Sequence, residues 1–113
     1  MDKNQSLNAF AALSQETRLD VFRLLIRVGP SGMLAGEIGE HLGVRQNTMS
    51  ANLAVLTQAG LIRNAREGRG IRYFANIGGV QGLLEYLMED CCGGKPELCQ
   101  PVIGQITKLA CAC

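Results

Sequence analysis

Two short apolar patterns on either side of Gly43 restrict this chain to few folds. Each pattern repeats at the spacing of one helix face, and the first one ends at the glycine. The second begins near Gln46 and ends at Gly60. Two helices joined by a tight glycine-containing turn, the second with a polar outer face, are typical of a helix-turn-helix. The apolar residues are Leu34, Ile38 and Leu42 in the first helix and Met49, Leu53 and Leu56 in the second.

Two further helices are predicted before this unit. The first has a short apolar stripe. The second has Ser14 as its predicted N-cap and ends at Gly29-Pro30, because glycine and proline stop helices. The stripe of the first helix consists of Leu7, Phe10, Ala11 and Leu13.

A hairpin and more helix are predicted after it. Two strand-like runs, residues 61–64 and 71–76, flank a charged, glycine-rich connector at 65–70, which predicts an exposed hairpin tip. A helix opens at Gly78-Gly79 and runs into Cys91-Cys92, where glycines end it. A last helical pattern occupies residues 102–109. The predicted fold class is mainly α with a small β-hairpin. The apolar side of the cysteine-adjacent helix consists of Val80, Leu83, Leu84, Leu87 and Met88.

Length and charge favour a small binding module. The 113 residues suffice for one domain but not for most enzyme scaffolds, and the net charge is only +1. The charges are unevenly placed, however. Residues 45–72 hold five arginines and one acid, whereas residues 85–97 hold four acids and one lysine. The middle of the chain therefore favours a polyanionic partner.

The second helix of the pair and the hairpin together predict double-stranded DNA as that partner. Recognition helices contact base edges through their N-terminal residues, where amide and hydroxyl side chains can pair with bases. Arginines on the adjacent hairpin suit phosphates. The predicted DNA-contacting residues are Arg45, Gln46, Asn47, Thr48, Ser50 and Ala51 on the helix and Arg66, Arg69 and Arg72 on the hairpin.

Four segments of the sequence resemble the ArsR/SmtB family of metal-responsive repressors. They are GVRQNTMSANLAVL at 43–56, AGLI at 59–62, REGR at 66–69, and residues 13–25 with their TRL at 17–19. The resemblance covers about residues 7–92. It implies a winged helix-turn-helix, a homodimer through the first and last helices, and repression of an operator that a metal or metalloid relieves. Two positions depart from the pattern: Arg45 stands where many members have a capping serine, and Asn52 where many have a histidine.

The inducer sites of this family differ in position between members. One arsenic site places three cysteines in a stretch that corresponds here to residues 34–39, which contain no thiol. The zinc site of other members uses histidine and carboxylate ligands along the dimer helix. The single histidine, His41, lies elsewhere and is expected to be a helix-surface residue.

All five cysteines lie in the last 23 residues. The N-terminus lacks a signal-peptide layout and no stretch predicts a transmembrane helix, so the protein is expected to be cytoplasmic, with no membrane partner. Cytosolic thiols are kept reduced, so the cluster predicts soft-metal binding or redox sensing rather than a disulfide framework.

Cys91, Cys92 and Cys99 form the predicted sensor site. They resemble the arsenic-responsive members that carry a vicinal cysteine pair and a third cysteine several residues later. Three soft thiolates without an imidazole suit a trivalent thiophilic ion better than zinc. Arsenite or antimonite is therefore the predicted inducer.

Two alternatives keep the fold and change the signal. The cysteines could form a disulfide and make the protein a thiol-redox regulator, or they could bind zinc or cadmium with a fourth ligand from Cys111 or Cys113. An enzyme is not predicted, because nothing pairs a nucleophile with a base and His41 is distant in sequence from every cysteine. The expected organisation is a DNA-binding and dimerisation domain at 1–92 and a cysteine-containing tail at 93–113.

Overall fold

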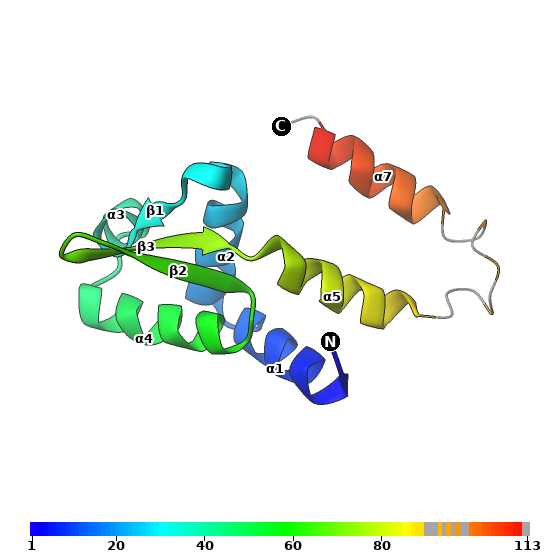
Figure 1. Cartoon of the computed structure of the whole chain (residues 1–113), viewed down its shortest axis with the longest axis horizontal. Helices are drawn as coiled ribbons and strands as arrows, with labels where there is room; N and C mark the ends of the chain where they lie inside the picture. Colours follow the sequence, from blue (N-terminus) through cyan, green and yellow to red (C-terminus); the bar gives the residue numbers. More distant parts are fainter. Residues whose placement is uncertain (90–92, 94, 96, 98–99, 112–113) are drawn as a thin grey trace.

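The computed structural model describes residues 1–89, 93, 95, 97 and 100–111. Its described part is mostly helical with one small antiparallel sheet, which confirms the predicted fold class (Figure 1). The elements are α1 (Lys3–Leu13), α2 (Glu16–Val28), η1 (Gly29–Ser31), β1 (Met33–Leu34), α3 (Ala35–Leu42), α4 (Gln46–Gln58), β2 (Ile62–Glu67), β3 (Gly70–Ala75), α5 (Ile77–Met88) and α7 (Gln100–Cys111).

The first two helices have side-chain caps at their N-termini. In a capping box, Asp2 accepts a hydrogen bond from the Gln5 backbone N–H, and the Gln5 side chain accepts one from the Asp2 N–H, both at 2.8 Å. The predicted N-cap at Ser14 is wrong by one residue. Ser14 ends α1 and its hydroxyl donates back to the Ala11 carbonyl, while Gln15 caps α2 by accepting from the Arg18 N–H.

The turn between α3 and α4 follows the sequence prediction. Gly43 has φ +67° in the left-handed region, and the Val44 N–H donates to the Gly39 carbonyl at 2.9 Å. A Cβ on Gly39 would lie 3.0 Å from the Val44 carbonyl oxygen, so glycine lets the chain fold back closely on α3. α4 then begins at Gln46, as predicted.

The hairpin is longer and its tip shorter than predicted. β2 continues to Glu67, which pairs with Gly70, so that only Gly68 and Arg69 form the turn. Gly68 has φ +60°, the conformation that two-residue hairpin turns require. No sequence pattern predicted β1, whose two residues pair with Tyr73 and Arg72 of β3 and complete a sheet of order β1-β3-β2.

One core joins the central helices to the sheet. The predicted stripe of α4 is confirmed, since Met49, Leu53 and Leu56 are fully buried. They pack with apolar side chains from α2, α3 and the start of β2. The core residues from those elements are Val21, Leu24, Leu25, Ile38, Leu61 and Ile62.

The predicted apolar faces of α1 and α5 are largely not buried. α1 turns Ser6, Ala9 and Ala12 inward, while Leu7 and Phe10 are exposed. Of the five apolar residues predicted on one side of α5, only Leu83 is fully buried. The periodicity correctly indicated helices. It could not show that the chain leaves these faces largely exposed.

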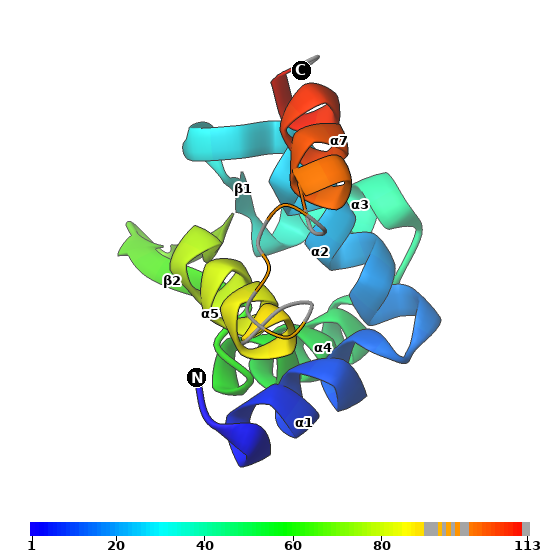
Figure 2. The same ribbon diagram turned by 90° about the vertical axis from the view of Figure 1, so that its right-hand side faces the viewer.

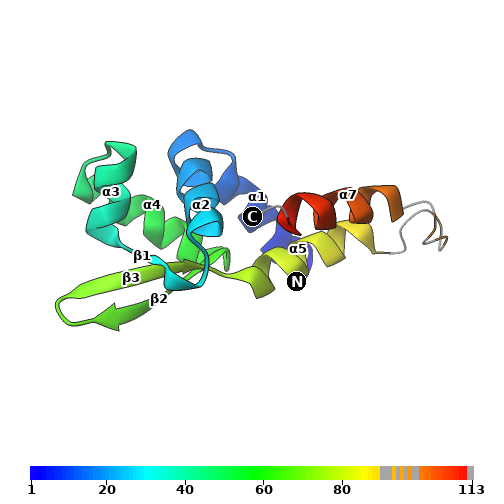
Figure 3. The same cartoon turned by 90° about the horizontal axis from the view of Figure 1, so that it is seen from above.

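The C-terminal region also departs from the prediction. α5 begins at Ile77 and ends at Met88, before the cysteine pair that it was expected to reach. Acids at 85 and 89 disfavour the negative end of a helix, which gives a physical reason for the early end. The predicted helix at 102–109 extends over Gln100–Cys111 as α7, which runs back antiparallel beside α5 (Figures 1 and 3). No described helix has the length and apolar character needed to cross a membrane.

Candidate DNA-binding surface

The N-terminus of α4, helix α3 and the tip of the β2–β3 hairpin lie at the same end of the molecule (Figures 1 and 3). The opposite end carries α5 and α7. All six predicted contact residues on and before α4 are exposed, which leaves them accessible to DNA. The structure thus brings the helix and hairpin positions together at one end, as the sequence predicted. Those six residues are Arg45, Gln46, Asn47, Thr48, Ser50 and Ala51.

The backbone N–H groups in the first turn of α4 receive no hydrogen bond acceptor from the side chain of the N-cap residue. Arg45 is the N-cap and makes no side-chain capping bond. The Thr48 N–H donates to the Asn47 side-chain oxygen at 2.8 Å. First-turn N–H groups carry the positive end of the helix dipole, which favours an anion such as a phosphate. With Arg45 in place of a capping serine, this end also gains a full positive charge.

The exposed face of α4 is divided between two environments. The side-chain nitrogen of Gln46 lies next to Gly39 of α3, where a Cβ on the glycine would collide with it. Asn47, Ser50 and Ala51 are exposed to solvent. Base recognition by all four residues stays a prediction. The geometry favours Asn47 and Ser50 for direct contact over Gln46.

The hairpin arginines differ in what they touch. Arg66 lies on β2 and Arg69 in the turn. Both are exposed, and the described residues offer neither of them an ion pair. Arg63, by contrast, lies over the ring of Phe74 with 4.4 Å between its guanidinium carbon and the ring centroid. Arg66 and Arg69 are therefore the hairpin cations best placed to meet phosphates.

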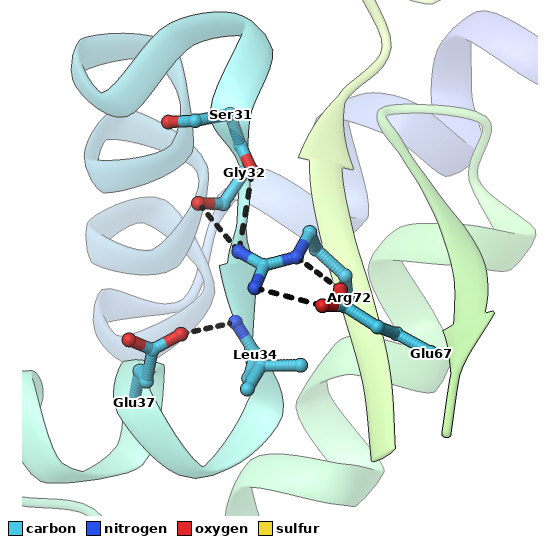
Figure 4. Close-up of polar contacts among 6 residues, drawn as sticks. All are labelled: Ser31, Gly32, Leu34, Glu37, Glu67 and Arg72. Carbon is cyan, nitrogen blue, oxygen red and sulfur yellow. Dashed lines mark hydrogen bonds and ion pairs between the residues drawn. The ribbon is translucent and has the colours of Figure 1, made fainter. Parts of the chain in front are cut away.

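Arg72 has an internal set of partners (Figure 4). Its guanidinium binds both carboxylate oxygens of Glu67, and one of its terminal nitrogens donates to the carbonyls of Ser31 and Gly32 at 3.2 and 3.4 Å. The hydrogen bond and the charge of Arg72 lower the pKa of Glu67, and the bond to Glu67 raises the pKa of Arg72. These bonds connect the hairpin to the turn that precedes α3.

That connection fixes the hairpin relative to the helix-turn-helix. Arg72 is on β3, whereas Ser31 and Gly32 lie about forty positions earlier in the chain. An arginine has five N–H donors, so four bonds leave little free capacity. The predicted contact of Arg72 with a phosphate stays a prediction, and it would compete with this arrangement.

Arg18 and Asn52 form a contact that sequence reasoning missed. Arg18 donates through Nε to the Ala12 carbonyl at 2.7 Å and through a terminal nitrogen to the Asn52 side-chain oxygen at 3.2 Å. Asn52 is buried on α4. The contact joins the end of α1 to the inner face of α4. Its residues are 34 positions apart, so the only sequence signal was that Asn52 departs from the family pattern.

The predicted sensor residues lie outside the residues that the structure describes. These are Cys91, Cys92 and Cys99. Cys111 closes α7, and Cys113 is also outside the described part. Among the described residues no group of three or more histidine, cysteine or acidic side chains could hold a metal ion. His41 is exposed on α3, as expected.

Comparison with known proteins gives the same assignment for the central part of the chain. A family described as a helix-turn-helix domain matches residues 13–64, which run from the end of α1 into β2. The transcriptional repressor SdpR of Bacillus subtilis (strain 168) is 32% identical over 91 residues, covering 80% of this chain and 98% of SdpR.

Solved structures share the fold. An ArsR-like transcriptional regulator from Rhodococcus sp. RHA1 superposes with a TM-score of 0.68 at 27% identity, covering 91% of this chain and 92% of that one. The homodimeric winged helix-turn-helix domain of a possible ArsR-family regulator from Mycobacterium bovis has a TM-score of 0.61 at 24% identity, over 77% and 81% of the two chains. These relatives are transcriptional regulators and not enzymes. The chain therefore belongs to the ArsR-like family of winged helix-turn-helix transcriptional repressors, with α4 as the second helix of its helix-turn-helix and the β2–β3 hairpin as its wing.

Proposed function

We propose that this repressor is a homodimer that leaves its operator when trivalent arsenic or antimony binds Cys91, Cys92 and Cys99. The observation that carries the proposal is the position of these three thiols in the chain. They fall between the end of α5 at Met88 and the start of α7 at Gln100. An ion held there would act directly on the helix whose apolar side chains are exposed.

The DNA side of the proposal rests on α4 and the wing. Asn47 and Ser50 would contact base edges of double-stranded DNA, and Arg66 and Arg69 would contact phosphates. A dimer is supported by exposed apolar side chains on α1 and α5 and by the homodimeric state of the Mycobacterium bovis relative. Two DNA-reading helices related by a twofold axis would suit an operator with two half-sites.

The chemistry of the donor set supports a trivalent ion. Glu85 and Glu89 are exposed at the end of α5, where the helix dipole is also negative. This field disfavours free thiolates. Three thiolates bound to a trivalent cation are neutral overall, so binding would remove the conflict. Zinc prefers a fourth ligand, which these three residues alone do not supply.

Release requires that the inducer bind the DNA-incompetent dimer more tightly than the DNA-competent one. A coupling free energy of about 1–3 kcal/mol is typical and weakens DNA binding roughly 5–150-fold. Reorganisation of the segment between α5 and α7 would provide the difference, because it changes how the end of α5 is held.

The test is an arsenite titration of the reduced protein bound to fluorescent operator DNA, selected beforehand from random duplexes. Arsenite should release the wild-type protein. The single variants Cys91→Ser, Cys92→Ser and Cys99→Ser should bind DNA normally and fail to respond. The matched control, Cys111→Ser with Cys113→Ser, should respond like the wild type.

Parallel titrations separate the alternatives. Release by peroxide but not by arsenite would favour a thiol-redox regulator. Release by zinc or cadmium, lost in the Cys111→Ser and Cys113→Ser control, would favour a four-ligand site. An unimpaired arsenite response of Cys99→Ser would contradict the three-thiol site.

A further inference from the structure

A hollow at the base of the wing lies between the end of α2 and the start of α5. Its volume of about 320 Å³ is within the range of small-molecule sites. β3 forms one wall of the hollow, contacts α2 and leads into α5 (Figures 1 and 3). None of the described residues that line it is a predicted DNA contact or a sensor cysteine. Its apolar side chains include Leu25, Ile26, Phe74, Ala75 and Ile77.

The apolar lining is partly open to water. Leu25 is fully buried, whereas Ile26 and Ile77 are 41% and 63% exposed. Gly29 contributes only backbone atoms, and a Cβ there would meet nothing within 4 Å, so the hollow stays open beside the end of α2. A concave apolar surface that keeps large side chains in water is typical of a site for an apolar ligand.

Arg63 is the one charged residue among the described residues that line the hollow. It lies opposite Phe74 in the β2–β3 pair, with its guanidinium carbon 4.4 Å from the centroid of the ring. A stacked guanidinium keeps its N–H donors at its edges. In the described part of the chain, no group accepts a hydrogen bond from this side chain and no carboxylate pairs with it. Arg63 can therefore bind an anion that enters the hollow.

We propose that this hollow binds a medium-chain aliphatic carboxylate, with the carboxylate on Arg63 and the chain against Leu25, Ile26 and Ile77. A guanidinium and a carboxylate form charge-assisted hydrogen bonds, often two in parallel. The aliphatic chain would remove the exposed isoleucines from water. This ligand site goes beyond the proposed function and requires neither the sensor cysteines nor the dimer.

The surroundings of Phe74 favour an aliphatic chain over an aromatic ligand. Arg63 covers one face of the ring, and a Cβ on Gly32 would lie 2.7 Å from two ring carbons, so the backbone also packs closely against it. Little ring surface is left for stacking. No described lining residue is acidic, and Arg27 in the last turn of α2 offsets the negative end of that helix. A carboxylate thus meets no opposing charge from these side chains.

The first experiment compares four probes by isothermal titration calorimetry with the reduced full chain: octanoate, butyrate, octanol and octylamine. Affinity should rise up to about fourfold for each CH₂ added between butyrate and octanoate, the effect of burying one such group. Octanol has no charge and octylamine is repelled by Arg63, so both should bind roughly tenfold more weakly than octanoate. Equal affinities for the three eight-carbon probes would overturn the proposal, because exposed apolar side chains anywhere could then explain the binding.

Three single variants test the role of Arg63. Arg63→Gln should weaken octanoate binding roughly tenfold, the loss expected for one hydrogen bond between charged groups. Arg63→Lys keeps the charge and should recover part of the affinity. The matched control Arg23→Gln removes an exposed cation of α2 that does not line the hollow, and it should bind octanoate like the wild type. Unchanged affinity in Arg63→Gln, or an equal loss in Arg23→Gln, would contradict the assigned carboxylate position.

A measurement on the wild-type protein locates the aliphatic chain. Nuclear Overhauser effects should connect the octanoate methylene and methyl protons with the methyl groups of Leu25, Ile26 or Ile77. This readout does not depend on any variant folding correctly. Effects only to apolar side chains of α1 or α7 would place the ligand elsewhere and overturn the site.

Discussion

The two ends of the molecule differ in their surface chemistry. At the DNA-reading end, Arg72, Glu67 and the turn before α3 are held together by hydrogen bonds within one chain. At the other end, nine of the described side chains on α1, α5 and α7 are large, apolar and exposed, against two of those described on α3, α4 and the wing. One end is thus held by polar bonds within the chain, whereas the other exposes apolar side chains to solvent.

The two ends are connected through the inner face of α4. Arg18 bonds the end of α1 to Asn52, which lies on the same helix as the exposed Asn47 and Ser50. Figure 2 shows α1 below both α4 and α5, and α1 contacts each of them. Direct contacts therefore connect α1 to α4, the helix that carries the proposed base-contacting residues. The predictions below test each end and this connection.

The largest effect is expected at the apolar end. Leu7→Ser with Phe10→Ser should weaken the dimer by about 4 kcal/mol, because four side chains at a twofold interface lose about 1 kcal/mol each when each is only half exposed beforehand. The measurement is the dimer dissociation constant by analytical ultracentrifugation. Ala11, also exposed on α1, gives the control Ala11→Ser. A full-strength dimer in the double variant would place the interface elsewhere.

This first prediction also marks the limit of what the sequence could establish. The helix-turn-helix was predictable because Gly43 and the stripe of α4 are local signals, and the structure confirms both. The exposure of Leu7 and Phe10 was not, because helical periodicity identifies an apolar face without saying whether the core of the same chain covers it. The predicted stripes on α1 and α5 are apolar surfaces that the chain itself leaves largely exposed.

For the candidate site, too, local features were predictable from the sequence and long-range contacts were not. Exposed residues at the start of α4 follow from its periodicity, and they are exposed in the structure. β1 was missed because two residues form a strand only through their partners on β3. The bonds of Arg72 were missed because their acceptors, Ser31 and Gly32, are distant in sequence. Contacts of long sequence separation leave no local pattern.

The next effect concerns the connection between the ends. Asn52→Ala should lower the free energy of unfolding by about 1–3 kcal/mol, because the partly buried Arg18 guanidinium loses the hydrogen-bond acceptor that the buried Asn52 provides. Urea denaturation monitored by circular dichroism measures the loss. Asn47→Ala, the exposed asparagine of the same helix, should change stability by no more than about 0.5 kcal/mol. Equal losses in the two variants would show that the Arg18 contact contributes little.

In DNA binding the larger effect is expected from Asn47→Ala. Asn47→Ala should cost about 1–3 kcal/mol at one operator position and leave the dimer intact, because only the base contact is removed. Competition binding with single-base operator variants measures this loss. Unchanged discrimination at every position would mean that α4 does not read bases through Asn47.

A smaller effect separates the arginines of the wing. The logarithm of the DNA-binding constant falls linearly with the logarithm of the salt concentration. Arg66→Ala and Arg69→Ala should each make this slope shallower by roughly 0.9, the contribution of one phosphate contact. Arg72→Ala is the comparison variant. If Arg72 acts by holding the wing against the turn before α3, DNA affinity falls while the salt slope stays that of the wild type. A slope reduced by the same amount in all three variants would show that Arg72 also contacts a phosphate.

The smallest effect is expected from Glu67, the exposed partner of Arg72. Its pKa in the folded protein is lowered from 4.5 by the hydrogen bond and charge of Arg72, so the ionised form stabilises the fold at neutral pH. That contribution is lost as the pH falls below 4.5 and the carboxyl takes up a proton. The thermal midpoint of Glu67→Gln should therefore lie slightly below the wild type at pH 7, and the difference should disappear in acid.

Because other carboxyls titrate in the same range, the readout is the difference between wild type and variant at each pH. The effect is small, since the pair is exposed to solvent and screened by salt. In an Arg72→Ala background, Glu67→Gln should produce no pH-dependent difference, because the partner that lowers the pKa is absent. A difference of the same size in that background would assign the effect to the charge of Glu67 alone and not to its bond with Arg72.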